Sequence, residues 1–410
     1  MSEAAPRRIL LADADAFFVA VARLVDPDGA GRAEHLLVGG SSRERGIVCS
    51  ASYAARQMGV RSAMPMARAT RLCPQAMVVP VPRECGQKSR EIARVLHEWA
   101  PVVQASSIDE WYLDMAGTEA LYHGEPLAET ARRIRQDVIE RTGLSVSFGG
   151  GTSKLVAKMA VEVAKPKPGT GATGVHIVPP GDEAAFLTRF DLGDFPGVGP
   201  KFQAKLATRG LRTVHEALAF GRDALARLLG DGEAAWLWDR IHGVSGAEVH
   251  AEREAKQMSR EDTFPHDIHD DAALARELTR LAVRVSADLR GDGLRARTVS
   301  VKIKDADFTV RSASHTLPEP IESERAIATE ARALLVKLRG KRRVGVRLLG
   351  VALSGLTEPA EALPRQLALF APDPDEQRES ERDRVLSQTV DRVREKFGRD
   401  AVVPGTLLDE

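Results

Sequence analysis

Carboxylates interrupt two apolar stretches of this sequence. Asp13 continues the run Ile9–Ala12, and Asp109 and Glu110 stand side by side within the aromatic segment Ser106–Asp114. A buried carboxylate is costly unless it is paired or binds a cation. Carboxylate oxygens are the ligands that Mg²⁺ prefers, and two such ions about 4 Å apart could activate an attacking oxygen and stabilise a leaving one. The two segments therefore indicate a cation site, although a structural role explains Asp13 alone equally well.

Two neighbouring details bear on that site. On a regular strand, Asp109 and Glu110 would point to opposite faces, so both can serve one site only if the chain bends there. Asp15 has an ordinary explanation as the N-cap of a helix that starts near Ala16.

Three lysines follow a glycine-rich segment. Gly149–Thr152 precede a helix predicted to run to Lys165, on which Lys154, Lys158 and Lys165 share one face at about 100° per residue. A helix opened by glycine and Ser/Thr offers backbone N–H groups to an anion. A solvated lysine face is the favoured alternative when the stripe is taken alone, and the ending of a Walker loop is missing.

A further pair could bind phosphate. Tyr53 and Arg56 are three residues apart and share a face if the segment is helical. Arg suits bidentate phosphate binding and Tyr offers a hydroxyl donor, but this signal is weak by itself.

The elements that must position these residues alternate in type. Strands are predicted at 9–12, 102–113 (strand, turn, strand) and 144–148, and helices at 89–100 and 130–141. Residues 181–250 read as all-helical. Residues 251–357 combine a clean alternation at 297–304 with two amphipathic helices, at about 271–290 and 321–339. The pattern predicts an α+β multidomain protein, with a linker at 371–384 and a helix at 384–397.

Composition narrows the class of protein. The chain has 410 residues, 43% hydrophobic, with 58 Lys+Arg against 58 Asp+Glu. No apolar run is long enough for a membrane span, no signal peptide begins the chain, and three cysteines without CxxC spacing favour a cytoplasmic location. The zero net charge hides a segregation: residues 293–347 carry 13 basic and 6 acidic side chains, and residues 358–410 carry 8 and 13. A solvated charged face explains the basic block about as well as a polyanion partner does.

The four motifs described above, namely the Asp13 segment, the Tyr53/Arg56 pair, the Asp109–Glu110 segment and the glycine–lysine segment, occur in the order and spacing of the Y-family DNA polymerases. The chain most resembles the DNA polymerase IV branch of that family. The matching stretches are 9–18, 46–65, 106–114, 147–166, 195–199 and 256–264. The resemblance implies a right-hand core with a palm (1–16 and 81–180), fingers (17–80) and a helix-hairpin-helix thumb (181–250). A βαββαβ-like little finger (251–357) and a tail (358–410) would follow.

The family pattern assigns roles to individual positions. It implies that Asp13, Asp109, Glu110 and the backbone carbonyl of Ala14 hold two Mg²⁺ ions. It makes Phe18 the steric gate that excludes a 2′-OH. Three triphosphate-binding positions are implied, namely Tyr53, Arg56 and Lys165.

Expected DNA contacts lie in the thumb and the little finger. The thumb turn contributes Gly197 and Gly199, whose backbone meets phosphate, and the basic strand contributes Arg297, Lys302 and Lys304. Small side chains at Ala12, Ala14, Ala16, Ser50 and Ala51 agree with a roomy, weakly selecting active site.

The tail carries the peptide QLALF at 366–370. It resembles the peptide by which bacterial polymerases bind the sliding clamp, through Gln366, Leu367, Leu369 and Phe370. The alternative is a short helix that packs on the body. The implied partners are primer-template DNA, dNTPs and the clamp, for a monomeric, low-fidelity translesion enzyme. The rival functions are a catalytically dead mutagenesis adaptor and a plain DNA- or clamp-binding module.

Overall fold

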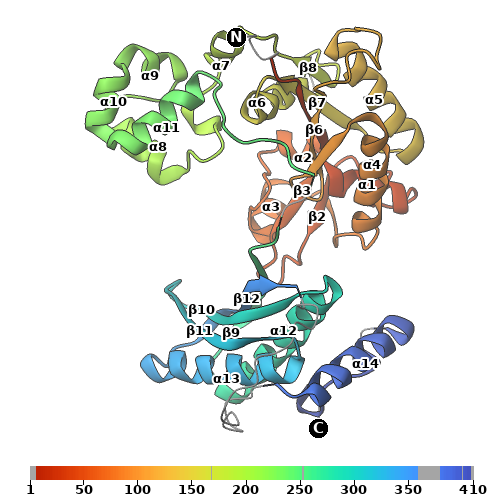
Figure 1. Cartoon of the computed structure of the whole chain (residues 1–410), viewed down its shortest axis with the longest axis vertical. Helices are drawn as coiled ribbons and strands as arrows, with labels where there is room; N and C mark the ends of the chain where they lie inside the picture. The colour runs from red at the N-terminus through yellow and green to blue at the C-terminus, as the bar shows by residue number, and fades with distance from the viewer. Residues whose placement is uncertain (1–5, 168, 252–253, 359–378, 399, 408–410) are drawn as a thin grey trace, which may run out of the picture. The chain divides into compact units, whose positions relative to one another are not determined.

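The computed structural model describes residues 6–167, 169–251, 254–358, 379–398 and 400–407. The chain divides into two compact units, residues 1–253 and 254–410, each shown in Figure 1. Within the described ranges, no helix combines the length and apolar character needed to cross a membrane.

A five-stranded sheet organises the first unit. Its order is β5-β6-β1-β7-β8, antiparallel throughout except that β7 and β8 run parallel. The central strand β1 is buried along its whole length, as its apolar sequence predicts. The strands are β1 (Ile9–Ala14), β5 (Val102–Ala105), β6 (Glu110–Asp114), β7 (Val146–Gly151) and β8 (Val175–Ile177).

Helices cover both faces of this sheet, and β1 alternates between them. Leu10 and Ala12 belong to the core with α4 (Cys85–Trp99) and α5 (Leu127–Thr142). Ile9 and Leu11 pack with α6 (Lys154–Ala164) on the other face. This alternation with period two places Asp13 on the α6 face.

A smaller sheet of order β3-β2-β4 lies in the same unit. Its strand β3 leads directly into α2, whose N-cap Ser52 accepts a hydrogen bond from the Ala55 N–H, as capping residues do. The elements are α1 (Phe17–Val25), β2 (Leu36–Gly39), β3 (Val48–Ala51), α2 (Tyr53–Gln57), α3 (Met66–Leu72) and β4 (Met77–Val79).

The predicted all-helical segment is helical. Its apolar side chains form a core of their own that also includes Leu155 and Met159 of α6. Its elements are α7 (Glu183–Leu187), η1 (Leu192–Asp194), α8 (Pro200–Ala207), α9 (Val214–Phe220), α10 (Arg222–Leu229) and α11 (Asp231–Ile241).

The second unit contains a four-stranded antiparallel sheet of order β11-β10-β12-β9. Val299, Val301 and Ile303 of β10 are fully buried against the helices, as their alternation predicts. The elements follow the order βαββαβ: β9 (Gln257–Ile268), α12 (Asp271–Gly291), β10 (Arg295–Asp305), β11 (Val310–Ile321), α13 (Glu324–Lys341) and β12 (Val346–Thr357).

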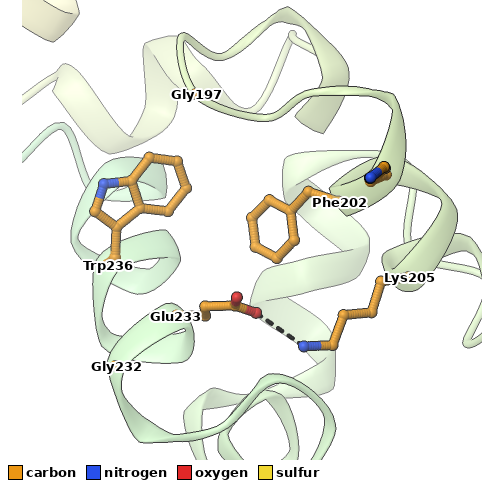
Figure 2. A pocket seen from close by; sticks show the side chains of 7 residues that line it. Gly197, Phe202, Lys205, Gly232, Glu233 and Trp236 are labelled. Carbon is orange, nitrogen blue, oxygen red and sulfur yellow. Dashed lines mark hydrogen bonds and ion pairs between the residues drawn. The ribbon is translucent and has the colours of Figure 1, made fainter. Parts of the chain in front are cut away.

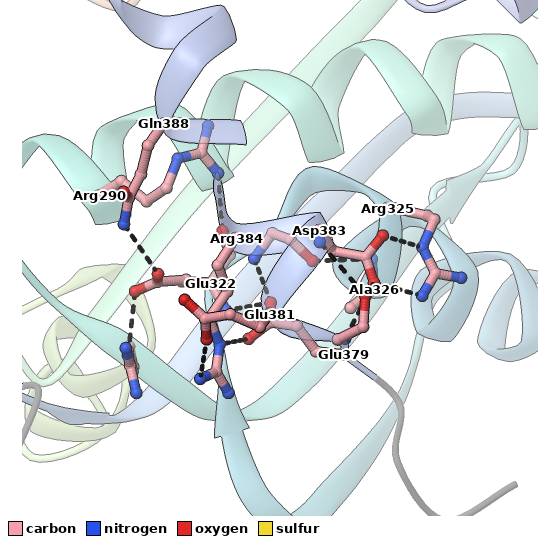
Figure 3. A network of polar contacts seen from close by, with 12 residues as sticks. Arg290, Glu322, Arg325, Ala326, Glu379, Glu381, Asp383, Arg384 and Gln388 are labelled. Atoms are coloured by element: carbon pink, nitrogen blue, oxygen red, sulfur yellow. Dashed lines mark hydrogen bonds and ion pairs between the residues drawn. The ribbon is translucent and has the colours of Figure 1, made fainter. Parts of the chain in front are cut away.

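A C-terminal helix, α14 (Glu381–Phe397), docks on this unit through ionic contacts (Figure 3). Arg290, whose side chain is 5% exposed, forms a bidentate salt bridge with Asp391. Its Nε lies 2.6 Å from Oδ2 and its Nη2 lies 2.9 Å from Oδ1. Arg325 forms a second such pair with Asp383. A short turn, η2 (Gly405–Leu407), follows. The docking of α14 could not be predicted from the sequence, because nothing in the helix itself indicates which distant residues its acidic side chains contact.

The expected α+β multidomain class is confirmed, including the βαββαβ order of the second unit. The linker predicted at 371–384 is wrong in its last part, because Ser380 caps α14 and the helix begins at Glu381. The clamp peptide residues Gln366, Leu367, Leu369 and Phe370 lie outside the described residues.

Candidate active site

The carboxylates of two antiparallel strands meet at one end of the central sheet. Asp13 on β1 is directly opposite Glu110, the first residue of β6. Glu110 shares the face of Tyr112, which packs with Ile9 and Leu11 in the α6-side core. Register and alternation therefore bring both carboxylates to the α6 face of the sheet.

Asp109 occupies the bend that this arrangement requires. Residues 107–109 form a bend between β5 and β6. The Asp109 carbonyl accepts a hydrogen bond of 2.9 Å from the Ala14 N–H, and its carboxylate accepts one of 2.5 Å from Ser107. Among the described residues, no three His, Cys, Asp or Glu side chains gather closely enough to form a metal-binding group. Asp109 is thus adjacent to the Asp13–Glu110 pair through its backbone.

The N-cap role predicted for Asp15 is wrong. Ala16, in the left-handed conformation at φ 48°, is the N-cap of α1. The Asp15 carboxylate instead accepts hydrogen bonds of 2.7 Å from both Ser145 and Ser147 on the β7 side. These donors satisfy an acid that is only 8% exposed, so Asp15 joins β1 to its neighbour.

The lysine stripe faces the carboxylates rather than solvent. Lys165 Nζ lies 2.9 Å from Asp13 Oδ2, and Lys158 pairs with Glu110 while lying 3.9 Å from Asp13. Lys154 lies over the Tyr112 ring, 4.4 Å from its centroid. The solvated-face alternative is therefore wrong. α6 ends at Ala164, and Lys165 is its C-cap.

Ser153 opens α6, and the glycines before it do not, because Gly149–Gly151 lie within β7. A Cβ on Gly149 would come within 2.2 Å of the Ala157 carbonyl oxygen and of the Val161 nitrogen. Glycine at this position therefore lets α6 approach the sheet closely. Ser153 caps α6 through the Val156 N–H and donates to the Gly243 carbonyl.

Burial is the largest single influence on the pKa values of Asp13 and Lys165. It raises the pKa of Asp13 from 3.8 to about 6, against the opposing effect of Lys165. Burial alone would lower the pKa of Lys165, but the carboxylates of Asp13 and Glu162 outweigh it and raise that pKa. Burial also raises the pKa of Tyr112 to about 12, with Glu110 adding to the effect. A cation beside the buried Asp13 carboxylate therefore stabilises its ionised form.

The predicted gate and phosphate-binding residues belong to the neighbouring elements. Phe18 lies in the first turn of α1, half-buried, with its ring edge-on to Phe17. On α2, the Arg56 guanidinium lies 5.4 Å from the Tyr53 ring centroid. Burial and the charge of Asp15 raise the pKa of Tyr53, and Lys165 and Asp13 also act on it. Tyr53 is therefore within electrostatic reach of the Asp15 and Asp13 carboxylates.

Three of the five small side chains predicted to line a roomy site are core residues. Ala12 and Ala14 pack in the core with α4 and α5, and Ala51 packs in the core of the small sheet. These residues are at most 3% exposed. These three side chains serve packing and give no evidence for a roomy active site.

The thumb-like turn forms the rim of a pocket of about 580 Å³ between α8 and α11 (Figure 2). Gly197 adopts φ 96°, which favours glycine, and a Cβ there would meet the Trp236 ring at 2.8 Å. Gly199 is the exposed N-cap of α8. Phe202 faces Trp236, with ring centroids 6.0 Å apart, and Lys205 pairs with Glu233 at 2.8 Å.

The basic strand of the second unit is partly neutralised. Arg297 is exposed, and its guanidinium donates to the Leu317 carbonyl. Lys302 pairs with Glu261 of β9 at 2.9 Å. Lys304 lies over the Phe308 ring. The structure thus leaves Arg297 the most accessible of the three residues predicted to contact DNA.

Sequence reasoning left out two sets of residues at the site. Lys158 shares the lysine stripe, and its spacing of four from Lys154 is the signal in the sequence that marks it. Ser145 and Ser147 gave no signal, because a serine in a strand is usually unremarkable. Only the register of β7 beside β1 brings them to Asp15.

Comparison with known proteins agrees with this geometry. The model of the impB/mucB/samB family matches residues 12–162, its C-terminal domain matches 255–369, and the IMS family HHH motif matches 180–211. A protein named DNA polymerase IV from Dehalococcoides mccartyi (strain CBDB1) is 34% identical over 400 residues, 97% of each chain. Another of that name from Streptomyces coelicolor is 38% identical over 353 residues, 85% of this chain and 71% of its own.

Solved structures share the fold. A Y-family DNA polymerase chimera superposes with a TM-score of 0.74 at 24% identity, covering 86% of this chain and 100% of its own. DinB from Sulfolobus solfataricus gives 0.57 at 25% identity, covering 85% and 98%. With family matches over both units and relatives aligned along almost the whole chain, the protein belongs to the Y family of DNA-directed DNA polymerases, in the DNA polymerase IV type.

Proposed function

We propose that this protein extends a primer on a DNA template by nucleotidyl transfer from dNTPs, with low fidelity and across damaged bases. The observation that carries the proposal is the register that sets Asp13 opposite Glu110, with Asp109 in the adjoining bend. The primer 3′-OH attacks the α-phosphate of the dNTP and pyrophosphate leaves.

The oxygen donors are of the kind that Mg²⁺ prefers, although among the described residues the three carboxylates do not gather into one group without an ion. Asp13 is 5% exposed, and its burial makes ionisation costly without a neighbouring cation; a hard divalent ion prefers such carboxylates. We assign Asp13, Asp109, Glu110 and the Ala14 carbonyl as ligands for two ions. When bound, the ions stabilise charge on the attacking and leaving oxygens.

The chain's own residues orient the nucleotide. Phe18 projects from the first turn of α1, where its ring would exclude a 2′-OH. Arg56 and Tyr53 present a guanidinium and a hydroxyl suited to phosphate, and Lys165 adds an ammonium beside Asp13. We assign these three residues to the triphosphate.

We assign DNA backbone contacts to the exposed turn at Gly197 and Gly199 and to Arg297, Lys302 and Lys304 of β10. Clamp binding is assigned to residues 366–370. The salt bridge of Lys302 with Glu261 reduces its share of phosphate attraction, so Arg297 and Lys304 should each contribute more than Lys302 to the salt dependence of binding.

A catalytically inactive mutagenesis adaptor is the rival reading. Such an adaptor would be expected to lose the carboxylates, and all three are present. Primer extension separates the two. Asp109→Ala or Glu110→Ala should lower Mg²⁺-dependent incorporation by at least about 10²–10³-fold, the scale seen when transition-state charge loses a partner.

Asp114→Asn is the matched control, because Asp114 ends the same strand and accepts from the Ala116 N–H. It should retain activity. Incorporation that survives both alanine variants would refute the catalytic assignment, and a wild-type protein that binds DNA without extending primers would favour the adaptor.

A further inference from the structure

Two ammonium groups occupy the surroundings of the carboxylates assigned to metal. Lys158 Nζ pairs with Glu110 and lies 3.9 Å from Asp13 Oδ2. Lys165 Nζ contacts Asp13 at 2.9 Å and Glu162 at 2.6 Å. The side chains of Lys158 and Lys165 are 25% and 18% exposed, so both charges are largely withdrawn from solvent. Asp13 and Glu110 therefore each have an ammonium partner, from α6 or from its C-cap.

Lys158 and Lys165 must move away from the carboxylates when a divalent ion and a triphosphate bind. A divalent ion between Asp13 and Glu110 would meet the Lys158 ammonium, which reaches toward both carboxylates, and like charges at short range repel. Lys165 has a second assigned partner in the triphosphate. When Lys165 turns to phosphate, Asp13 loses its ammonium and its buried carboxylate needs another cation.

We propose that Lys158 is a cation placeholder, a positioning residue that holds Glu110 and Asp13 before metal binds and couples metal entry to nucleotide entry. The proposal rests on the proposed function. It predicts that the resting protein binds divalent metal weakly by itself, because the metal must displace Lys158. The nucleotide then assists by drawing Lys165 away from Asp13.

The test measures Mn²⁺ binding to the full chain without DNA or nucleotide, by the electron paramagnetic resonance signal of free Mn²⁺. Lys158→Met keeps the length of the side chain and removes the charge. It should bind Mn²⁺ at least about fivefold more tightly than wild type, within the usual range of coupling. Lys158→Arg, which restores the charge, should bind like wild type.

Lys167→Met controls for net charge. Lys167 pairs with Glu162 at 3.6 Å and donates to its carbonyl, so Mn²⁺ affinity should not change. Thermal denaturation adds a second readout. Metal-free Lys158→Met should melt below wild type, and added Mn²⁺ should narrow the difference. Unchanged or weaker Mn²⁺ binding by Lys158→Met would overturn the placeholder.

Glu110→Gln distinguishes this failure from failure of the proposed function. If Glu110→Gln weakens Mn²⁺ binding while Lys158→Met leaves it unchanged, only the placeholder is wrong. If Glu110→Gln binds Mn²⁺ as wild type does, the metal site itself is wrong, and the placeholder falls with it.

Discussion

A single methyl group at Gly149 should disturb the site by pushing α6 away from β7. The Cβ of an alanine would lie 2.2 Å from the Ala157 oxygen and the Val161 nitrogen, both backbone atoms. Restoring an ordinary 3.4 Å contact requires the helix to move by about 1.2 Å. Overpacking of this kind costs about 1–3 kcal/mol. Lys158 and Lys165 would move with α6.

Thermal denaturation and single-nucleotide incorporation measure the two consequences. For a unit of this size, 1 kcal/mol lowers Tm by about 2–4 °C, so the cost of about 1–3 kcal/mol should make Gly149→Ala melt about 2–12 °C below wild type. A misplacement of about 1 Å can cost about 10²-fold in rate. Incorporation by the folded variant should therefore fall by about that factor.

Gly86→Ala is the matched control. Gly86 lies in α4, and a Cβ there would meet only Arg90 Nη1, at 3.7 Å. Alanine in place of glycine within a helix is worth about 0.5–1 kcal/mol, so this variant should be as stable as wild type or more so. The close-approach argument fails if Gly149→Ala melts within 1 °C of wild type, or if both variants lose stability alike.

Four further predictions concern the candidate active site, α14 and residues 366–370. Phe18→Ala should admit ribonucleotides; unchanged dNTP/rNTP discrimination in single-nucleotide assays would remove the gate. The folded pKa of Asp13 lies above its usual value, so its contribution to stability is present below about pH 4 and is lost as pH rises through about 6. Metal-free Asp13→Asn should therefore gain Tm relative to wild type between pH 4 and 7, and a constant difference would contradict the raised pKa. Asp391→Asn leaves Arg290 without its charged partner and should weaken α14 docking by about 1.5–3 kcal/mol, seen as faster hydrogen exchange in α14; unchanged protection would show that the pair contributes little. Deleting 366–370 should abolish clamp stimulation of primer extension and spare basal synthesis, and equal stimulation would reject that peptide.

The sequence predicts strands and their faces well where one physical pattern dominates. The apolar run at Ile9–Ala12 predicts a buried strand, and the alternation at Val299, Val301 and Ile303 predicts one buried face. Both are observed. These patterns depend on burial alone, which the residue types record.

Partners that come from distant segments could not be predicted. Asp15 looks like a cap in isolation, and only the register of β7 beside β1 reveals its serine donors. The lysine stripe looks solvated for the same reason, because the opposing carboxylates lie on β1 and β6. The ionic docking of α14 depends on Arg290, 101 residues before Asp391.

The docking of α14 also bounds how far residues 366–370, which we propose bind the clamp, can lie from the second unit. Glu358 follows β12, and Glu379 is held at the other end by hydrogen bonds from the Glu322 and Ser323 N–H groups. Gln366 is eight residues from the first anchor and Phe370 nine from the second. An extended chain spans at most about 3.6 Å per residue, so a clamp bound at the peptide would stay within roughly 30 Å of these anchors. The peptide would then be tethered to the second unit at both ends by short segments. Such a tether would restrict how far the second unit can move relative to a clamp that holds the peptide.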